Sequence, residues 1–192
     1  MLRVFCLMAT VVVALPVSAQ TRVTPAASKP AAAEPAPFPS WDVRLGASLQ
    51  DRTGPEKGVV NFTGEIVTPK LFTLTDRIAG AFVPRFHLGT SLNAESTRFA
   101  YAGATWTAEL TKQVFVEASL GAAINDGKTG ALVPLDRVAM GCNGGLRQAA
   151  SAGVRLNDRW SVVATLEHMT NGGACDRSRG MSNFGARLGY TF

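Results

Sequence analysis

The last eleven residues of the chain, SNFGARLGYTF (182–192), change character at every second position. One parity holds Phe184, Leu188, Tyr190 and the terminal Phe192, whereas Arg187 takes the other. Side chains two apart on a β-strand point to the same face of the sheet. The segment therefore predicts a strand with one apolar face and one polar face.

The same alternation recurs upstream from Trp41 onward. The eight predicted strands are residues 41–50, 58–67, 80–89, 98–107, 114–123, 146–156, 160–170 and 182–192. A membrane-crossing strand takes about 9–11 residues, so this spacing predicts a small antiparallel barrel. The connections Glu109–Lys112 and Asn157–Arg159 are tight, whereas Asn125–Gly144 is long and rich in glycine. Short turns at one end and longer loops at the other are typical of an outer-membrane barrel with periplasmic termini.

The residues on the two faces predict which way the barrel is turned. One face is charged, with Arg44, Glu65, Arg85, Glu117, Arg155, Glu167 and Arg187, and the other is mostly Val, Leu, Ala, Phe and Trp. Charges inside and apolar residues outside predict an all-β, eight-stranded antiparallel transmembrane β-barrel of the bacterial outer membrane. The terminal aromatic Phe192 resembles the assembly signal of such barrels. The alternative is a soluble lipocalin-like barrel, which would enclose the apolar face around a ligand.

Two segments precede the predicted barrel at 41–192. Residues 1–19, MLRVFCLMATVVVALPVSA, combine Arg3, an apolar stretch and small residues before Gln20, and they predict a signal peptide cleaved after Ala19. An uncleaved anchor is the alternative, but the apolar run is shorter than the ~20 residues that span a bilayer. Residues 20–40 hold five of the ten prolines and many alanines, which predicts a flexible leader.

Charge and cysteine usage limit the function classes. The net charge of +5 is compatible with anionic lipid or phosphate partners. Removing the signal leaves Cys142 and Cys175, and an even pair in an exported chain predicts one disulfide. These cysteines form no metal-ligand cluster or Cys-x-x-Cys pair, and there is no phosphate loop, zinc motif or basic aromatic surface. We expect no metal, no cofactor and no nucleic-acid partner.

Two polar residues interrupt the outer face of the predicted strand 160–170. His168 and Thr170 share the parity of Leu166, so they face lipid near the extracellular end of the strand. Polar groups are costly there unless they lie at the interface or have a function. A histidine that takes the proton of a neighbouring hydroxyl activates it as a nucleophile. The pair is therefore a candidate catalytic site, with an interfacial polar band as the alternative.

The segment LEHMTNGGACDRSRGMSNFGARLGYTF (166–192) resembles the end of the lipid A deacylase family, the acyloxyacyl-hydrolase-type enzymes of the outer membrane. That family has His-x-Ser-Asn near the top of its penultimate strand, then a short loop, an Asn-x-Gly-like element and a final strand ending in an aromatic. His168, Asn171 and Gly180 match this pattern in type and spacing. PRFHLGTSLNAESTRFAYAGATW (84–106) resembles the central hairpin of the same family.

The chain departs from the family pattern at two positions. Thr170 stands where the family has its serine nucleophile, and its extra methyl crowds attack and stiffens χ1. Ser182 stands where the family has an acidic residue that orients the histidine, and by parity it faces outward with His168. Glu167 is the nearest acid in sequence but points into the lumen. Asp176 is a candidate substitute for the missing acid.

The resemblance implies cleavage of an ester-linked acyl chain of lipopolysaccharide, at its lipid A part. His168 would be the general base, Thr170 the nucleophile and Ser182 the orienting residue. Asn171, Gly172 and Gly173 would stabilise the oxyanion, and Arg98, Arg177 and Arg179 are candidate contacts for lipid A phosphates. The alternatives are a catalytically inactive structural or interaction barrel and a narrow pore. The sequence leaves a homodimer open.

Overall fold

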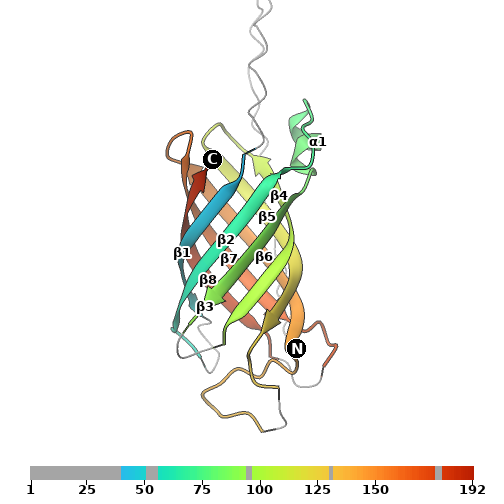
Figure 1. Cartoon of the computed structure of the whole chain (residues 1–192), viewed down its shortest axis with the longest axis vertical. Helices are drawn as coiled ribbons and strands as arrows, with labels where there is room; N and C mark the ends of the chain where they lie inside the picture. Colours follow the sequence, from blue (N-terminus) through green and yellow to red (C-terminus); the bar gives the residue numbers. More distant parts are fainter. Residues whose placement is uncertain (1–39, 51–55, 94–96, 130–131, 176–178) are drawn as a thin grey trace, which may run out of the picture. The chain divides into compact units, whose positions relative to one another are not determined.

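The computed structural model describes residues 40–50, 56–93, 97–129, 132–175 and 179–192. The elements of these ranges are β1 (Asp42–Gln50), β2 (Val60–Lys70), α1 (Arg77–Ala81), β3 (Arg85–Leu92), β4 (Phe99–Glu109), β5 (Val114–Asn125), β6 (Gly144–Arg155), β7 (Trp160–Thr170) and β8 (Met181–Thr191) (Figure 1). The predicted signal peptide and nearly all of the predicted leader lie outside the described residues. Among the helices within these ranges, none has the length and apolar character needed to cross a membrane.

The strands form a closed barrel in sequence order, with every neighbouring pair antiparallel. Closure comes from β1 and β8, which pair from Asp42 opposite Thr191 to Gln50 opposite Asn183. Both termini of the barrel and α1 lie at one end, here called the terminal end, whereas the β5–β6 connection lies at the other, the loop end (Figure 1). The predicted fold class is confirmed.

The two faces of the barrel wall are arranged as the alternation predicts. Phe62 is 70% exposed on the outer surface, and Leu45, Leu120 and Phe184 are likewise exposed. Arg44, Glu65, Glu117, Glu167 and Arg187 are buried inside. The soluble lipocalin-like alternative is wrong, because the large apolar side chains of the strands point out of the barrel rather than into it.

Buried ion pairs fill the middle of the lumen. The guanidinium of Arg44 donates two hydrogen bonds to Glu117, at 2.6 and 2.9 Å. Arg147 donates two to Glu167, at 2.9 and 2.7 Å. A third arginine, Arg187, bridges Glu65 and Glu167 at 3.0 and 3.3 Å. Side chains therefore occupy the space that a narrow pore would need, as expected for an eight-stranded barrel.

The third predicted strand, residues 80–89, is wrong in its first half. Residues 77–81 form α1, whose N-cap Asp76 accepts a hydrogen bond of 2.7 Å from the Ala79 N–H. A carboxylate cap satisfies a free N–H of the first turn and so favours a helix over an extended chain. β3 then begins at Arg85, directly after Pro84. The alternation of Phe82, Pro84 and Phe86 therefore spans a helix end and a strand start.

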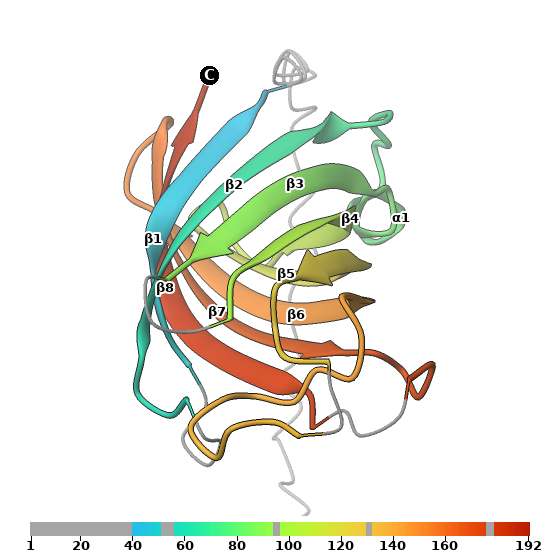
Figure 2. The ribbon, with the colours of Figure 1, turned by 60° about the horizontal axis from the view of Figure 1, so that its bottom comes forward.

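Loops cover the loop end of the barrel (Figure 2). The buried carboxylate of Glu56, before β2, accepts hydrogen bonds from the Thr97 N–H at 3.0 Å and the Val138 N–H at 3.1 Å. It also lies 3.3 Å from Arg137 Nε. Val138 also belongs to a cluster of buried apolar side chains. The members of this cluster are Phe99, Tyr101, Ala123, Val138, Met140, Met169 and Met181. The β5–β6 loop is thus anchored over the lumen beside the ends of β7 and β8.

Candidate active site on the outer wall

A small polar patch interrupts the apolar outer wall near the loop end of β6, β7 and β8. Its members are His168 and Thr170 on β7, Ser182 on β8 and Gln148 on β6. Exposed apolar side chains surround it, namely Leu146, Leu166 and Phe184. The alternation of β7 explains the placement, because His168 and Thr170 continue the outward series of Trp160, Val162, Ala164 and Leu166.

His168 is hydrogen-bonded to Ser182 across the β7–β8 pair. The two residues are directly opposite in register, and Nδ1 of the imidazole lies 2.8 Å from Oγ of the serine. Which atom donates depends on the histidine tautomer. Both side chains are half-buried. The cross-strand register therefore brings together two of the residues that the sequence singled out.

Thr170 lies on the same wall but forms a different contact. As the last residue of β7, it accepts a hydrogen bond of 3.2 Å at Oγ1 from the N–H of Gly172. Within the described residues, no hydrogen bond joins Thr170 to His168. The predicted base and nucleophile thus share a face, but the structure does not pair them.

Gly180 packs against the imidazole of His168. A β-carbon at this position would lie 3.0 Å from His168 Cε1 and 3.1 Å from Nε2, which is tighter than ordinary contact. The φ angle of Gly180 is +67°, in the left-handed region that favours glycine. Position 180, which matched the family pattern, therefore favours glycine because any larger side chain would crowd the imidazole of His168.

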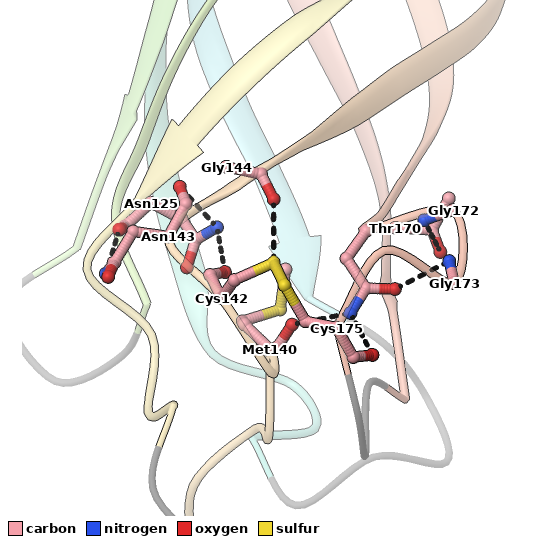
Figure 3. Close-up of a disulfide and its surroundings, with 10 residues drawn as sticks. Asn125, Met140, Cys142, Asn143, Gly144, Thr170, Gly172, Gly173 and Cys175 are labelled. Atoms are coloured by element: carbon pink, nitrogen blue, oxygen red, sulfur yellow. Dashed lines mark hydrogen bonds between the residues drawn. A yellow bond between two sulfur atoms is a disulfide. The ribbon is translucent and has the colours of Figure 1, made fainter.

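The predicted oxyanion donors are engaged within the β7–β8 loop (Figure 3). The amide Nδ2 of Asn171 donates to the Cys175 carbonyl at 2.8 Å. The Gly173 N–H donates to Asn171 Oδ1 at 2.9 Å, and the Gly172 N–H donates to Thr170. Asn171 is buried. These three residues therefore shape the turn after β7, and their donors already have partners.

A disulfide between Cys142 and Cys175 joins the β5–β6 loop to the β7–β8 loop, with 5.9 Å between the Cα atoms (Figure 3). This confirms the predicted pair. The loops also meet through the N–H of Arg179, which donates to the carbonyl of Ala139 at 3.0 Å. The chain that leads into Gly180 and β8 is therefore tied to the loop that covers the lumen.

Gln148 is a member of the patch that the sequence analysis did not identify. It is exposed on β6, and its Cα pairs with that of His168 on the side opposite Ser182. Its amide makes no hydrogen bond within the described part of the chain. The available signal was its parity, because Gln148 interrupts the outward series of Leu146, Ala150 and Ala152.

The predicted phosphate contacts do not all lie near the patch. Arg179 directly precedes Gly180 and is exposed. Arg98 precedes β4, where its Nε donates to the Asn93 carbonyl at 2.7 Å and lies 4.0 Å from Asp126. The strands β5 and β6 separate β4 from β7, which is about 14 Å along the sheet at the usual strand spacing. Arg177 lies outside the described residues.

The acidic residues are placed as follows. Glu167 points into the lumen, as predicted, and bonds Arg147 and Asn183 there. Asp176, the candidate substitute acid, lies outside the described residues. Among the residues that the structure describes, no carboxylate is hydrogen-bonded to His168, and no three His, Cys, Asp or Glu side chains are grouped to hold a metal ion.

Comparison with known proteins identifies the family. The chain is similar to the crystal structure of the outer-membrane enzyme PagL, with a TM-score of 0.61 and 13% identity, covering 77% of this chain and 97% of that one. The N-terminal β-barrel domain of Pseudomonas aeruginosa OprF has a TM-score of 0.50 and 13% identity, covering 80% and 97%. A de novo designed transmembrane β-barrel has a TM-score of 0.52 and 10% identity, covering 80% and 95%.

These structural matches support the barrel fold alone. No curated protein matches the chain significantly. The model of the family described as lipid A 3-O-deacylase (PagL) matches residues 76–191, from the residue before α1 to the end of β8, and so includes the whole polar patch of the outer wall. This chain therefore belongs to the lipid A 3-O-deacylase (PagL) family of outer-membrane β-barrel proteins.

Proposed function

We propose that this protein hydrolyses an ester-linked acyl chain of lipid A at the outer-wall patch of His168, Thr170 and Ser182. The observation that carries the proposal is the 2.8 Å hydrogen bond between His168 and Ser182 on a wall that presents mostly apolar side chains to lipid. An imidazole beside a hydroxyl is the arrangement that activates an alcohol nucleophile. The family match supplies the substrate class.

The position of the patch suits a membrane-embedded substrate. We place the loop end of the barrel toward the cell exterior, because both barrel termini lie at the opposite end. The patch then lies at the depth of the outer leaflet, which lipopolysaccharide occupies. The ester can reach His168 by lateral movement in the leaflet, without entering the lumen.

In this proposal His168 is the general base, and a hydroxyl beside it is the nucleophile. The family resemblance assigns the nucleophile to Thr170 and the orienting position to Ser182. Asn171, Gly172 and Gly173 stabilise the oxyanion only if their donors exchange their loop acceptors for the substrate. The amide of Gln148, which has no hydrogen-bond partner within the described residues, is a second source of such a donor. Arg179, which directly precedes Gly180, is proposed to contact lipid A phosphates, as is Arg177, whereas Arg98 lies beside β4, three strands from β7.

The proposal includes export by a signal peptide at 1–19 that is cleaved after Ala19, followed by the flexible leader 20–40. N-terminal sequencing of the protein isolated from outer membranes tests the cleavage, and a mature chain that begins at Gln20 is the expected result. Chemical cross-linking in outer membranes tests the homodimer.

Mass spectrometry of lipid A from cells that express the chain tests the activity. Wild-type protein is expected to remove one ester-linked acyl chain, and His168→Ala is expected to leave the lipid A pattern unchanged. Heat-modifiable gel migration shows whether each barrel is folded. A folded wild-type barrel with no effect on lipid A would favour the rival function, an inactive structural or interaction barrel. The absence of a carboxylate partner for His168 among the described residues is the observation behind that rival.

A further inference from the structure

The hydroxyl that contacts His168 belongs to Ser182. The two residues face each other in register on β7 and β8, and His168 is also paired with Gln148 of β6 on its other side. The 2.8 Å separation of Nδ1 and Oγ is within the reach that a general base needs for the proton it abstracts. The proton-transfer geometry is therefore already formed at Ser182 in the free protein.

Thr170 is placed less favourably for the same role. Its Oγ1 accepts the N–H of Gly172 in the turn that ends β7. It is two residues from His168 on one strand, which separates the Cα atoms by roughly 6.5 Å. Its β-branch also crowds attack on a carbonyl carbon, whereas Ser182 presents a primary alcohol.

Ser182 is a poor substitute for the acidic residue that orients the histidine in the family pattern. A carboxylate there would stabilise the imidazolium that forms during the reaction, and a neutral hydroxyl lacks the charge to do so. Among the described residues His168 has no carboxylate partner to compensate. A histidine bonded to one hydroxyl and to no acid matches a two-residue unit of base and nucleophile better than a triad that needs an orienting acid.

Resting on the proposed deacylase function, we infer that Ser182, rather than Thr170, is the nucleophile of this protein. His168 and Ser182 then form a cross-strand dyad on the lipid-facing wall. Residue 182, which is acidic in the family pattern, therefore supplies the nucleophile in this protein. Thr170 shapes the turn after β7 through its contact with Gly172.

The chemistry balances with these groups and water. Ser182 Oγ attacks the ester carbonyl carbon of the acyl chain, and its proton passes to Nδ1 of His168. The tetrahedral intermediate collapses as the bond from the acyl carbon to the lipid A oxygen breaks, and the imidazolium returns the proton to that oxygen. His168 then takes a proton from a water molecule that attacks the acyl carbon, the bond from that carbon to Ser182 Oγ breaks, and the imidazolium returns the proton to Oγ as the fatty acid leaves. His168 must carry its resting proton on Nε2, the atom that faces Gly180.

Three variants of the full-length protein separate the two assignments in the lipid A assay. Ser182→Ala is expected to lower deacylation by at least about 10³-fold, the scale for removing a catalytic nucleophile. Thr170→Ala is expected to keep deacylation within about tenfold of wild type, because under this assignment it loses only the hydrogen bond from the Gly172 N–H. Ser182→Glu restores the family's acid and is expected to be inactive. Heat-modifiable migration must show that all three barrels fold.

The site of acylation gives a second readout. Trypsin places Thr170 in the peptide from Trp160 to Arg177 and Ser182 in the peptide from Gly180 to Arg187. A serine-reactive fluorophosphonate added to the folded wild-type protein in detergent is expected to mark the second peptide, and His168→Ala is expected to abolish the labelling.

Opposite results would overturn the assignment. If wild type is active, Ser182→Ala stays active, Thr170→Ala is inactive and Ser182→Glu gains activity, then Thr170 is the nucleophile and Ser182 only orients His168. If folded wild type leaves lipid A unchanged, the deacylase function fails and the dyad fails with it. The first outcome removes only the nucleophile assignment, so the two failures are distinguishable.

Discussion

The barrel has two histidines, and each bonds a hydroxyl of the neighbouring strand through Nδ1 at 2.8 Å. His87 on β3 bonds Thr105 inside the lumen and is 3% exposed. His168 on β7 bonds Ser182 on the outer wall. The local chemistry is the same, but only the outer pair can meet a lipid ester. The comparison teaches that the face of the wall, more than the pair itself, gives this site its function.

The largest expected difference between the two pairs lies in activity. His168→Ala removes the proposed general base and is expected to lower deacylation by about 10²–10⁴-fold. His87→Ala is expected to keep deacylation within about threefold of wild type, because the lumen pair does not reach substrate. Substitutions away from a functional site act mainly on stability. Lipid A mass spectrometry measures both. Equal losses in folded barrels would break the comparison.

Neighbouring residues on the two faces are expected to differ in stability. Glu167→Ala leaves Arg147 and Arg187 buried without this partner, and losing one member of a buried pair costs about 3–5 kcal/mol. Leu166→Ala, one residue earlier and facing lipid, is expected to cost only about 1–2 kcal/mol, because it loses apolar surface that contacts detergent but leaves no buried charge without a partner. Urea unfolding of the refolded barrels in detergent measures both free energies. A Leu166 variant as unstable as the Glu167 variant would contradict this account.

The contact between Gly180 and His168 is expected to affect activity through position. Gly180→Ala introduces a β-carbon 3.0 Å from the imidazole and is expected to lower deacylation by up to about 100-fold, since small misplacements of catalytic groups have effects of this size. Gly58→Ala, before β2, is the matched control. Its φ is +76°, but a β-carbon there meets no atom within 4 Å. Similar losses in both variants would assign the effect to backbone strain.

Gln148 tests whether the patch extends to the other side of His168. Gln148→Ala removes an exposed amide that has no partner within the described residues, and the expected loss is about tenfold, the value of one hydrogen bond to the reacting group. Gln148→Asn keeps the amide and is expected to recover part of the activity. The ratio of kcat to KM in detergent is the measurement. An unchanged Gln148→Ala enzyme would confine the site to β7 and β8.

The smallest expected effect concerns the exposed arginines. Arg179→Ala, next to Gly180, is expected to raise KM by up to about fivefold, because an exposed charge contact contributes at most about 1 kcal/mol. Arg98→Ala, beside Asn93 and Asp126, is expected to leave KM unchanged. Steady-state kinetics with purified lipid A compares the two. An equal rise for both variants would mean that substrate also contacts the wall near β4.

Particular residues show how far alternation alone predicts this fold. The inward side of Glu167 and the shared outward side of His168 and Thr170 are confirmed, because side-chain direction on a strand depends only on parity. In the predicted strand 98–107, aromatic residues occur on both parities, so the alternation does not tell which face is inside. The structure places Phe99 and Tyr101 inside. They pack in the apolar cluster with Val138, from a loop far away in sequence, so parity alone could not distinguish a lipid-facing aromatic from a lumen-facing one.

The sequence by itself determined the faces of most strands, the charged lumen, the pairing of Cys142 with Cys175 and the polar interruption at the end of β7, because each follows from local periodicity or residue count. Only the tertiary structure decided which groups meet. The β7–β8 register sets Ser182 against His168, the β6–β7 register adds Gln148, and the loop turn takes up the hydroxyl of Thr170. Register depends on barrel closure and on turn geometry, which no single strand encodes.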